Sequence, residues 1–196
     1  MLNARGNARA EEVHLIRAAA DLSGAVQTRL TADDGHDSLY PDLALGRDGA
    51  LVVWWDRRDG DAEVYAADLD LDAGALATPE RLTRTPGTST GAYATAAPGG
   101  YAVAYDDDTP GDREVFAVLL GDRGRRERVR VSCAPCGSFV PAIAWNGEAL
   151  GVAWNDFCDA SSDDDFARAD VYFAALPPPA TRPAATPARR GPRERD

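Results

Sequence analysis

Acidic side chains gather in three short stretches of the sequence, each of which has the composition of a turn. The first stretch places Asp56, Asp59, Asp61 and Glu63 within eight residues. Hard cations such as Ca²⁺ take six to eight oxygen ligands, which clustered carboxylates could supply. The spacing does not fit the EF-hand loop, and Asp and Gly also form ordinary β-turns without any metal. We favour the β-turn and keep these four residues as calcium candidates; no other cofactor is indicated.

The other two acidic stretches follow along the chain. They comprise Asp106, Asp107, Asp108 and Asp112 in the second, and Asn155, Asp156, Asp159, Asp163, Asp164 and Asp165 in the third. Glycoside hydrolysis needs two carboxyl groups that face one sugar about 5–9 Å apart. Turns at the rims of separate sheets point apart, so the spacing does not indicate such a pair. Glycan hydrolysis by this chain is therefore not predicted.

Three cysteines form the second chemical pattern. Cys133 and Cys136 make a C-x-x-C pair, and Cys158 lies in the third acidic stretch. A structural zinc site takes four ligands, and the sequence shows no second pair or histidine cluster nearby. The βαβ setting of a thioredoxin-type motif is absent as well. A disulfide between Cys158 and one of the other two, or free thiols, remain as alternatives.

Nucleophilic catalysis lacks its usual residues. The only histidines are His14 and His36, and neither lies near a G-x-S-x-G elbow. The sequence also contains no phosphate-binding loop and no dinucleotide fingerprint. We identify no catalytic residues and predict that the chain is not an enzyme.

The acidic stretches are positioned by a repeat of short β-strands. An acid, a valine and an aromatic residue or histidine recur at spacings of 51, 51 and 56 residues, in Glu12-Val13-His14, Glu63-Val64-Tyr65, Glu114-Val115-Phe116 and Asp170-Val171-Tyr172. A further strand follows in Arg29-Leu30-Thr31, Arg81-Leu82-Thr83 and Arg130-Val131-Ser132. The preceding strand ends on an aromatic residue and Asp or Asn, which aligns Trp55-Asp56 with Tyr105-Asp106 and Trp154-Asn155. This alignment interprets the recurring aromatics as core, with a sugar or peptide platform as the alternative. It sets Trp54 apart, because its counterparts are Ala104 and Ala153.

Four short strands in each unit are typical of a propeller blade. The run from Leu51 to Trp55 is apolar on both faces, as in a sheet that is covered on both sides. The sequence thus predicts an all-β fold of tandem four-stranded antiparallel blades, a partial β-propeller of about three to four blades. The predicted boundaries are a disordered lead at 1–10, a repeat domain at 11–176 with units at 12–38 (half), 39–89, 90–138 and 139–176 (partial), and a disordered Pro- and Arg-rich tail at 177–196.

These repeats resemble the sialidase-like and TolB-like propeller repeats of bacterial secreted and envelope proteins. The motifs P-x-[IL]-A, [VA]-W-x-D and G-[DN]-x-E-[IV]-Y carry the resemblance, matched by Pro41, Leu43, Val53, Trp55, Asp56, Gly60, Asp61, Glu63, Val64 and Tyr65, and by Pro141, Ile143, Ala144, Trp145, Trp154, Val171 and Tyr172. The resemblance implies a propeller fold and an extracellular or cell-envelope location. The sialidase Asp box is absent, and no motif brings Arg17, Arg58 and Arg113 together as a triad. The resemblance therefore implies no reaction.

The net charge and the hydropathy of the sequence argue against some classes of binding partner. A net charge of −11 argues against nucleic acid, which needs a basic surface. No apolar run reaches the length of a membrane span, and the first residues lack the apolar region of a signal peptide. The units at both ends have fewer than four strands, which predicts edge-strand association or self-association. We predict a non-catalytic repeat module that binds a protein or glycan, or alternatively a fragment of a sialidase-like glycoside hydrolase whose catalytic blades lie outside this chain.

Overall fold

The computed structural model describes residues 10–47, 49–121, 124–133, 135–158 and 169–179. Within these ranges the chain forms strands and turns and contains no α-helix, and hence no helix that could cross a membrane. The predicted all-β fold is confirmed. The predicted disordered lead and tail lie outside the described residues, except for residue 10 and residues 177–179.

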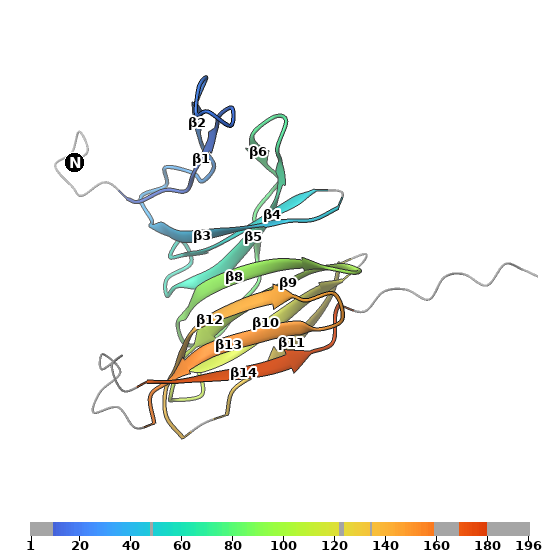
Figure 1. Cartoon of the computed structure of the whole chain (residues 1–196). Helices are drawn as coiled ribbons and strands as arrows, with labels where there is room; N and C mark the ends of the chain where they lie inside the picture. The colour runs from blue at the N-terminus through green and yellow to red at the C-terminus, as the bar shows by residue number, and fades with distance from the viewer. Residues whose placement is uncertain (1–9, 48, 122–123, 134, 159–168, 180–196) are drawn as a thin grey trace, which may run out of the picture.

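Four antiparallel sheets follow one another in chain order (Figure 1). The first sheet pairs β1 (His14–Arg17) with β2 (Val26–Arg29). The second is built from β3 (Ser38–Leu45), β4 (Ala50–Asp56) and β5 (Glu63–Asp70), with two short outer strands, β6 (Ala75–Leu76) and β7 (Glu80–Arg81). The third contains β8 (Ser89–Ala97), β9 (Gly100–Asp107), β10 (Glu114–Gly121) and β11 (Arg125–Arg130). The fourth contains β12 (Ser138–Trp145), β13 (Leu150–Asp156) and β14 (Asp170–Leu176).

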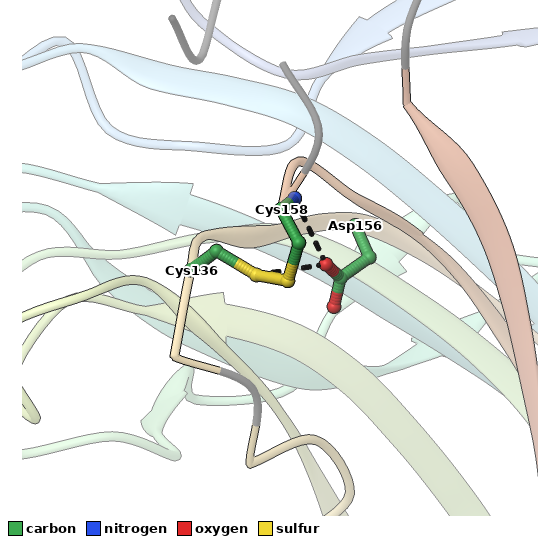
Figure 2. A group of neighbouring side chains, drawn as sticks. All are labelled: Cys136, Asp156 and Cys158. Atoms are coloured by element: carbon green, nitrogen blue, oxygen red, sulfur yellow. Dashed lines mark hydrogen bonds between the residues drawn. A yellow bond between two sulfur atoms is a disulfide. The ribbon is translucent and has the colours of Figure 1, made fainter. Parts of the chain in front are cut away.

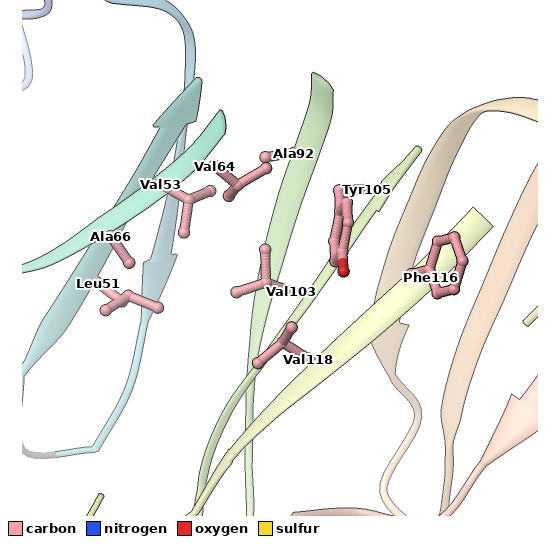
Figure 3. Packing of buried hydrophobic residues seen from close by; sticks show 9 residues of the cluster. All are labelled: Leu51, Val53, Val64, Ala66, Ala92, Val103, Tyr105, Phe116 and Val118. Atoms are coloured by element: carbon pink, nitrogen blue, oxygen red, sulfur yellow. The ribbon is translucent and has the colours of Figure 1, made fainter. Parts of the chain in front are cut away.

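The second and third sheets pack face to face through small and β-branched side chains (Figure 3). Leu51 and Val53 of β4 face the third sheet, whereas Val52 and Trp54 face the first. Every residue of β4 is buried, because both faces of its sheet are covered. This arrangement explains why the β4 sequence is apolar at consecutive positions rather than at alternate ones.

The strand register corrects the predicted alignment of the aromatic residues. Ser38 pairs with Asp56, Ser89 with Asp107, and Ser138 with Asp156. The aromatic residue two positions before each of these Asp residues is therefore Trp54, Tyr105 or Trp154. Each stacks on the aromatic residue opposite it on the next strand, namely Tyr65, Phe116 or Tyr172, with ring centroids 5.8–6.0 Å apart.

Trp54, and not Trp55, is thus the repeated core position. The sequence could not distinguish the two, because both are tryptophans on a strand that is apolar on both faces. A slip of one residue exchanges the two faces of a strand, so Trp55 lies on the opposite face from Trp54. The counterparts of Trp55 in the other sheets are Asp106 and Asn155.

A β-bulge interrupts the first strand of each of the last three sheets, β3, β8 and β12, which we call the inner strands. The register shifts after Leu39, Thr90 and Phe139, and the next residue has a positive φ, at Tyr40 (50°), Gly91 (59°) and Val140 (51°). Residues other than glycine seldom take this conformation, and they do so mostly where the surrounding structure imposes it. The bulges leave Tyr40 71% exposed and Val140 45% exposed. The inner strand β8 lies beside both β3 and β12, so the three bulges are neighbours.

Candidate functional site

The strands β4, β9 and β13 each end on a buried aspartate whose carboxylate stabilises the turn that follows. Each accepts a hydrogen bond from the serine that begins the inner strand, and another from the backbone N–H two residues further along the chain. The donors are Ser38 (2.8 Å) and Arg58 N (2.8 Å) for Asp56, Ser89 (2.7 Å) and Thr109 N (2.8 Å) for Asp107, and Ser138 (3.1 Å) and Cys158 N (3.2 Å) for Asp156. These three members of the acidic stretches have a structural role in the turn.

The calcium candidates of the second sheet are engaged by protein donors. The Asp56 carboxylate also accepts from the indole N–H of Trp54 (3.0 Å) and the guanidinium of Arg58. Burial raises the pKa of Asp56, but these hydrogen bonds outweigh it and the net pKa lies below its usual value. Glu63 is buried and forms an ion pair with Arg81 at 2.6 Å.

The two remaining candidates are more exposed. Asp59 accepts from the Tyr65 hydroxyl and from Arg81, and Asp61 is exposed. The four carboxylates do not form a cluster of ligand atoms; in the part of the chain that the structure describes, the one such cluster consists of Cys136, Asp156 and Cys158. The preference for β-turns over a calcium site at these four residues stays a prediction. Asp159 and residues 163–165 of the third stretch lie outside the described residues.

The cysteine cluster contains a covalent cross-link (Figure 2). Cys136 and Cys158 form a disulfide with their Cα atoms 5.0 Å apart, and Cys133 is exposed and free. The Cys136 sulfur lies 3.0 Å from Oδ1 of Asp156. Because both sulfurs of the cluster are in the disulfide, they are not thiolate ligands. Cys158 occupies the position of Arg58, so a covalent bond stands where the second sheet has an ion pair.

A pocket of about 360 Å³ opens beside the three bulges. It lies at the beginnings of the inner strands β3, β8 and β12. Aromatic side chains, one ion pair and exposed backbone line it, from Tyr40, Trp55, Thr90, Gly91, Ala92, Tyr93, Asp106, Arg113, Phe139 and Val140. This volume is within the range of about 300–1,000 Å³ that is usual for small-molecule sites.

One wall of the pocket is aromatic. Tyr40 and Trp55 stack with their ring centroids 5.9 Å apart and their planes inclined by 21°. The guanidinium of Arg57 lies over Trp55, 5.3 Å from the ring centroid. Tyr40 is held out from its strand by the bulge and is mostly exposed. Such a pair presents a flat apolar face with a polar hydroxyl, which suits ligands that have both apolar and polar surfaces.

Another part of the lining is polar, and its groups are hydrogen-bonded to one another. Asp106 is 3% exposed and forms an ion pair with Arg113 at 2.5 Å. The Thr90 hydroxyl donates to Asp106 (2.8 Å), and the Val140 backbone N–H donates to its other oxygen (3.2 Å). A Cβ atom on Gly91 would lie 2.5 Å from Oδ2 of Asp106. Glycine at the second bulge therefore makes room for this carboxylate and also accommodates the positive φ.

The structure brings together residues that the sequence left apart. Arg113 and Asp106 are neighbours in the pocket, whereas Arg58 bonds Asp56 and Arg17 donates to the carbonyls of Leu71 and Asp72. The three arginines therefore do not form a triad. Sequence reasoning also missed Tyr40 and Tyr93. The signal that could have found Tyr40 is the position two residues after the repeated serine.

A larger hollow of about 1,000 Å³ lies at the other ends of β3 and β8. Glycine, alanine and backbone atoms make up much of its lining, together with Arg47, Asp68, Asp70 and Tyr101. Its charged groups lie on loops and near strand ends. The smaller pocket is the better candidate, because it combines an aromatic wall with a buried charged pair.

Comparison with known proteins supports the β-propeller class. No family model and no curated protein matches the sequence. Among solved structures, the chain is similar to an α-L-arabinofuranosidase from Lactobacillus brevis (TM-score 0.58, 12% identity, 89% of this chain and 65% of that one). It is also similar to TolB from Acinetobacter baumannii (TM-score 0.54, 16% identity, 85% and 38%). A third similar structure is a thermostable family-43 glycoside hydrolase (TM-score 0.54, 10% identity, 88% and 69%).

The chain is a β-propeller-type repeat domain. It spans less than two thirds of the length of the first two of these structures. At identities of 10–16% the likeness concerns the fold alone, because one fold serves many unrelated functions.

Proposed function

We propose that this chain is a non-catalytic β-propeller module that binds a neutral glycan in the pocket beside the three bulges. The observation that carries the proposal is that the stacked pair of Tyr40 and Trp55 lines the same pocket as the ion pair of the buried Asp106 with Arg113. The names of the arabinofuranosidase and the family-43 hydrolase are consistent with a ligand of this class.

The two walls match the two kinds of surface on a sugar ring. The C–H faces of a sugar pack on flat aromatic rings, while its hydroxyl groups take up hydrogen bonds from charged or hydroxyl side chains. Tyr40 supplies an exposed ring, and Arg113 and Thr90 supply polar groups in the lining of the same pocket. The net charge of −11 disfavours an anionic sugar by repulsion.

Binding fits the pocket better than hydrolysis does. The residues lining the pocket include one carboxylate, that of Asp106, and it is paired with Arg113. The usual glycosidase mechanism needs two carboxyl groups with different proton affinities on either side of the bond that is cleaved. The described lining thus offers recognition groups without the second carboxylate.

The test is a titration of the full chain with neutral oligosaccharides, arabino-oligosaccharides among them, followed by calorimetry. Tyr40→Ala should weaken binding about five- to thirty-fold, because a ring platform contributes roughly 1–2 kcal/mol. The matched control is Leu45→Ala, a substitution of an exposed side chain at the far end of the same strand, which should bind as the wild type does. Unchanged binding by Tyr40→Ala, or no binding of any neutral glycan by the folded wild type, would refute the proposal.

The alternative is a fragment of a glycoside hydrolase whose catalytic blades lie outside this chain. The observation that favours it is the similarity to longer glycoside hydrolase structures. Because the catalytic blades would lie outside this chain, the test is to express the chain together with any in-frame flanking coding sequence and to measure reducing ends released from oligosaccharides. Release by the extended protein but not by this chain would favour the hydrolase fragment, whereas no release by either would leave the binding module as the better account.

A further inference from the structure

The fourth sheet ends on a strand that has an open edge. β1, β5 and β10 each pair with an outer strand, whereas β14 pairs only with β13 in the part of the chain that the structure describes. Three large hydrophobic side chains of β14 are also exposed, Val171 at 76%, Tyr172 at 48% and Phe173 at 70%. Unpaired backbone groups along such an edge can recruit another strand.

The first three sheets use one chemical pattern to attach the outer segment. In each sheet one valine, near the start of β5 or β10 or just before β1, donates its backbone N–H to a Thr or Ser hydroxyl of the outer segment. The carbonyl of the same valine accepts the backbone N–H of the aliphatic residue that precedes this Thr or Ser. The hydroxyl bonds are Val13–Thr31 (2.9 Å), Val64–Thr83 (2.8 Å) and Val115–Ser132 (2.8 Å), and the carbonyl bonds are Leu30–Val13, Leu82–Val64 and Val131–Val115, all 2.8 Å. The Arg–aliphatic–Thr/Ser triplet in the sequence is therefore the attachment motif of the outer segment.

Charge adds to this attachment. In the second sheet the triplet arginine, Arg81, bonds Glu63, the acid that precedes the valine. In the third sheet Arg130 bonds Glu114 in the same way, and both N–O distances are 2.6 Å. A charge-assisted hydrogen bond of this kind is stronger than a neutral one.

β14 presents the same groups without an occupant. Val171 pairs with Asn155 in the same register in which Val64 pairs with Trp55 and Val115 with Asp106. The N–H and C=O of Val171 therefore point to the open edge. Asp170 holds the position of Glu63 and Glu114 and is exposed, and its side chain has no hydrogen-bond or ion-pair partner within the described ranges.

We propose that β14 binds an extended strand from a partner polypeptide that carries an Arg–aliphatic–Thr/Ser triplet, with the arginine on Asp170 and the hydroxyl on the Val171 N–H. This is strand addition at a sheet edge, with the triplet providing the specificity. Residues 177–196 of the chain itself contain no such triplet and begin with three consecutive prolines, which cannot donate to a strand ladder. The site is separate from the glycan pocket, so the two proposals stand or fail independently.

The probe is a fluorescently labelled peptide with the sequence of residues 79–85, PERLTRT, titrated against the full chain by anisotropy. We expect saturable binding and slower amide hydrogen exchange in residues 170–176. Replacing both Arg81 and Thr83 by Ala in the peptide should weaken binding at least about ten-fold, since this removes one charged and one neutral hydrogen bond.

Two substitutions of one residue form the matched pair on the protein. Val171→Pro removes the N–H that faces the open edge, while the N–H groups that face β13 remain. Val171→Ala removes the side chain and keeps that N–H. The proline variant should lose peptide binding, whereas the alanine variant should keep most of it, with both melting cooperatively.

Three results would overturn the proposal. They are equal binding of the doubly substituted peptide, undiminished binding by a folded Val171→Pro variant, or exchange protection that appears elsewhere and not in β14. As a further arm, Asp170→Asn should weaken the original peptide several-fold but leave the doubly substituted peptide unaffected, because the latter has no arginine to pair.

Discussion

Trp54 and Trp55 are adjacent in sequence, but the structure gives them different roles, and replacing each by Phe should separate those roles. Trp54 is fully buried, stacks on Tyr65 and donates its indole N–H to Oδ2 of Asp56. Trp55 lies on the other face, where it stacks on the exposed ring of Tyr40 in the pocket. Trp54→Phe should therefore destabilise the fold, and Trp55→Phe should mainly affect the pocket.

The magnitude follows from the contacts that each substitution removes. A hydrogen bond to a charged acceptor contributes about 1.5–3 kcal/mol, and the smaller ring leaves a void that costs about 1 kcal/mol more. Trp54→Phe should thus lower the free energy of unfolding by about 2.5–4 kcal/mol, or the melting temperature by roughly 5–16 °C. Trp55→Phe retains a ring against Tyr40 and should lower the free energy of unfolding by no more than about 1 kcal/mol.

Urea unfolding of the two variants, followed by circular dichroism at matched protein concentration, measures both values. Unchanged m-values would show that the difference is one of stability and not of the unfolded state. If Trp55→Phe destabilises the fold as much as Trp54→Phe does, the assignment of Trp54 to the repeated core position is wrong.

Four further outcomes are expected. Burial raises the pKa of Asp56 and Asp107, but their hydrogen bonds lower it by more, so the net pKa of each lies below the usual 3.8. The stabilisation from these two carboxylates is present above that value and is lost as the pH falls below it. The urea concentration at the unfolding midpoint should therefore decrease as the pH is lowered from about 5 to about 2. Asn at both positions should flatten that profile. Reducing the disulfide, or Cys136→Ser, should lower the free energy of unfolding by about 3 kcal/mol, because the unfolded chain regains the entropy that the cross-link removes. An unchanged midpoint would show that the disulfide does not stabilise the fold. Gly91→Ala should destabilise the third sheet, because its Cβ would lie 2.5 Å from Asp106; a variant as stable as the wild type in urea would contradict this. Adding Ca²⁺ should leave the melting temperature unchanged, because protein donors already engage the acidic turn of the second sheet, and a rise that Mg²⁺ does not produce would support the calcium prediction instead.

The strand repeat could be predicted because it depends on local patterns. The acid–Val–aromatic triplets and the Arg–aliphatic–Thr/Ser triplets recur at nearly constant spacing, and in the first three sheets the valine N–H donates to the Thr or Ser hydroxyl in the same way. The alignment of the strand before them was wrong by one residue in the second sheet. Consecutive tryptophans gave no alternation from which to determine which side chain faces which neighbour.

The pocket could not be predicted in the same way, because its residues come from three different sheets. Tyr40, Asp106 and Phe139 are separated by 33 residues or more in the sequence and line one cavity. The bulges that expose Tyr40 and Val140 have a backbone conformation that neither residue favours on its own. Glycine occupies the equivalent position in β8, but one glycine among eighteen does not reveal a bulge.

The sequence by itself determined the class of fold, because strand periodicity and turn composition are local properties that each segment carries independently of the others. It also determined the position of the outer-strand motif, whose hydroxyl and arginine act on a neighbouring strand of the same sheet. The tertiary structure alone decided which face of β4 each tryptophan occupies, which cysteine pairs with Cys158, and which charged groups share the pocket. These features depend on how whole sheets pack against one another, and packing distances between sheets are not encoded in any single segment.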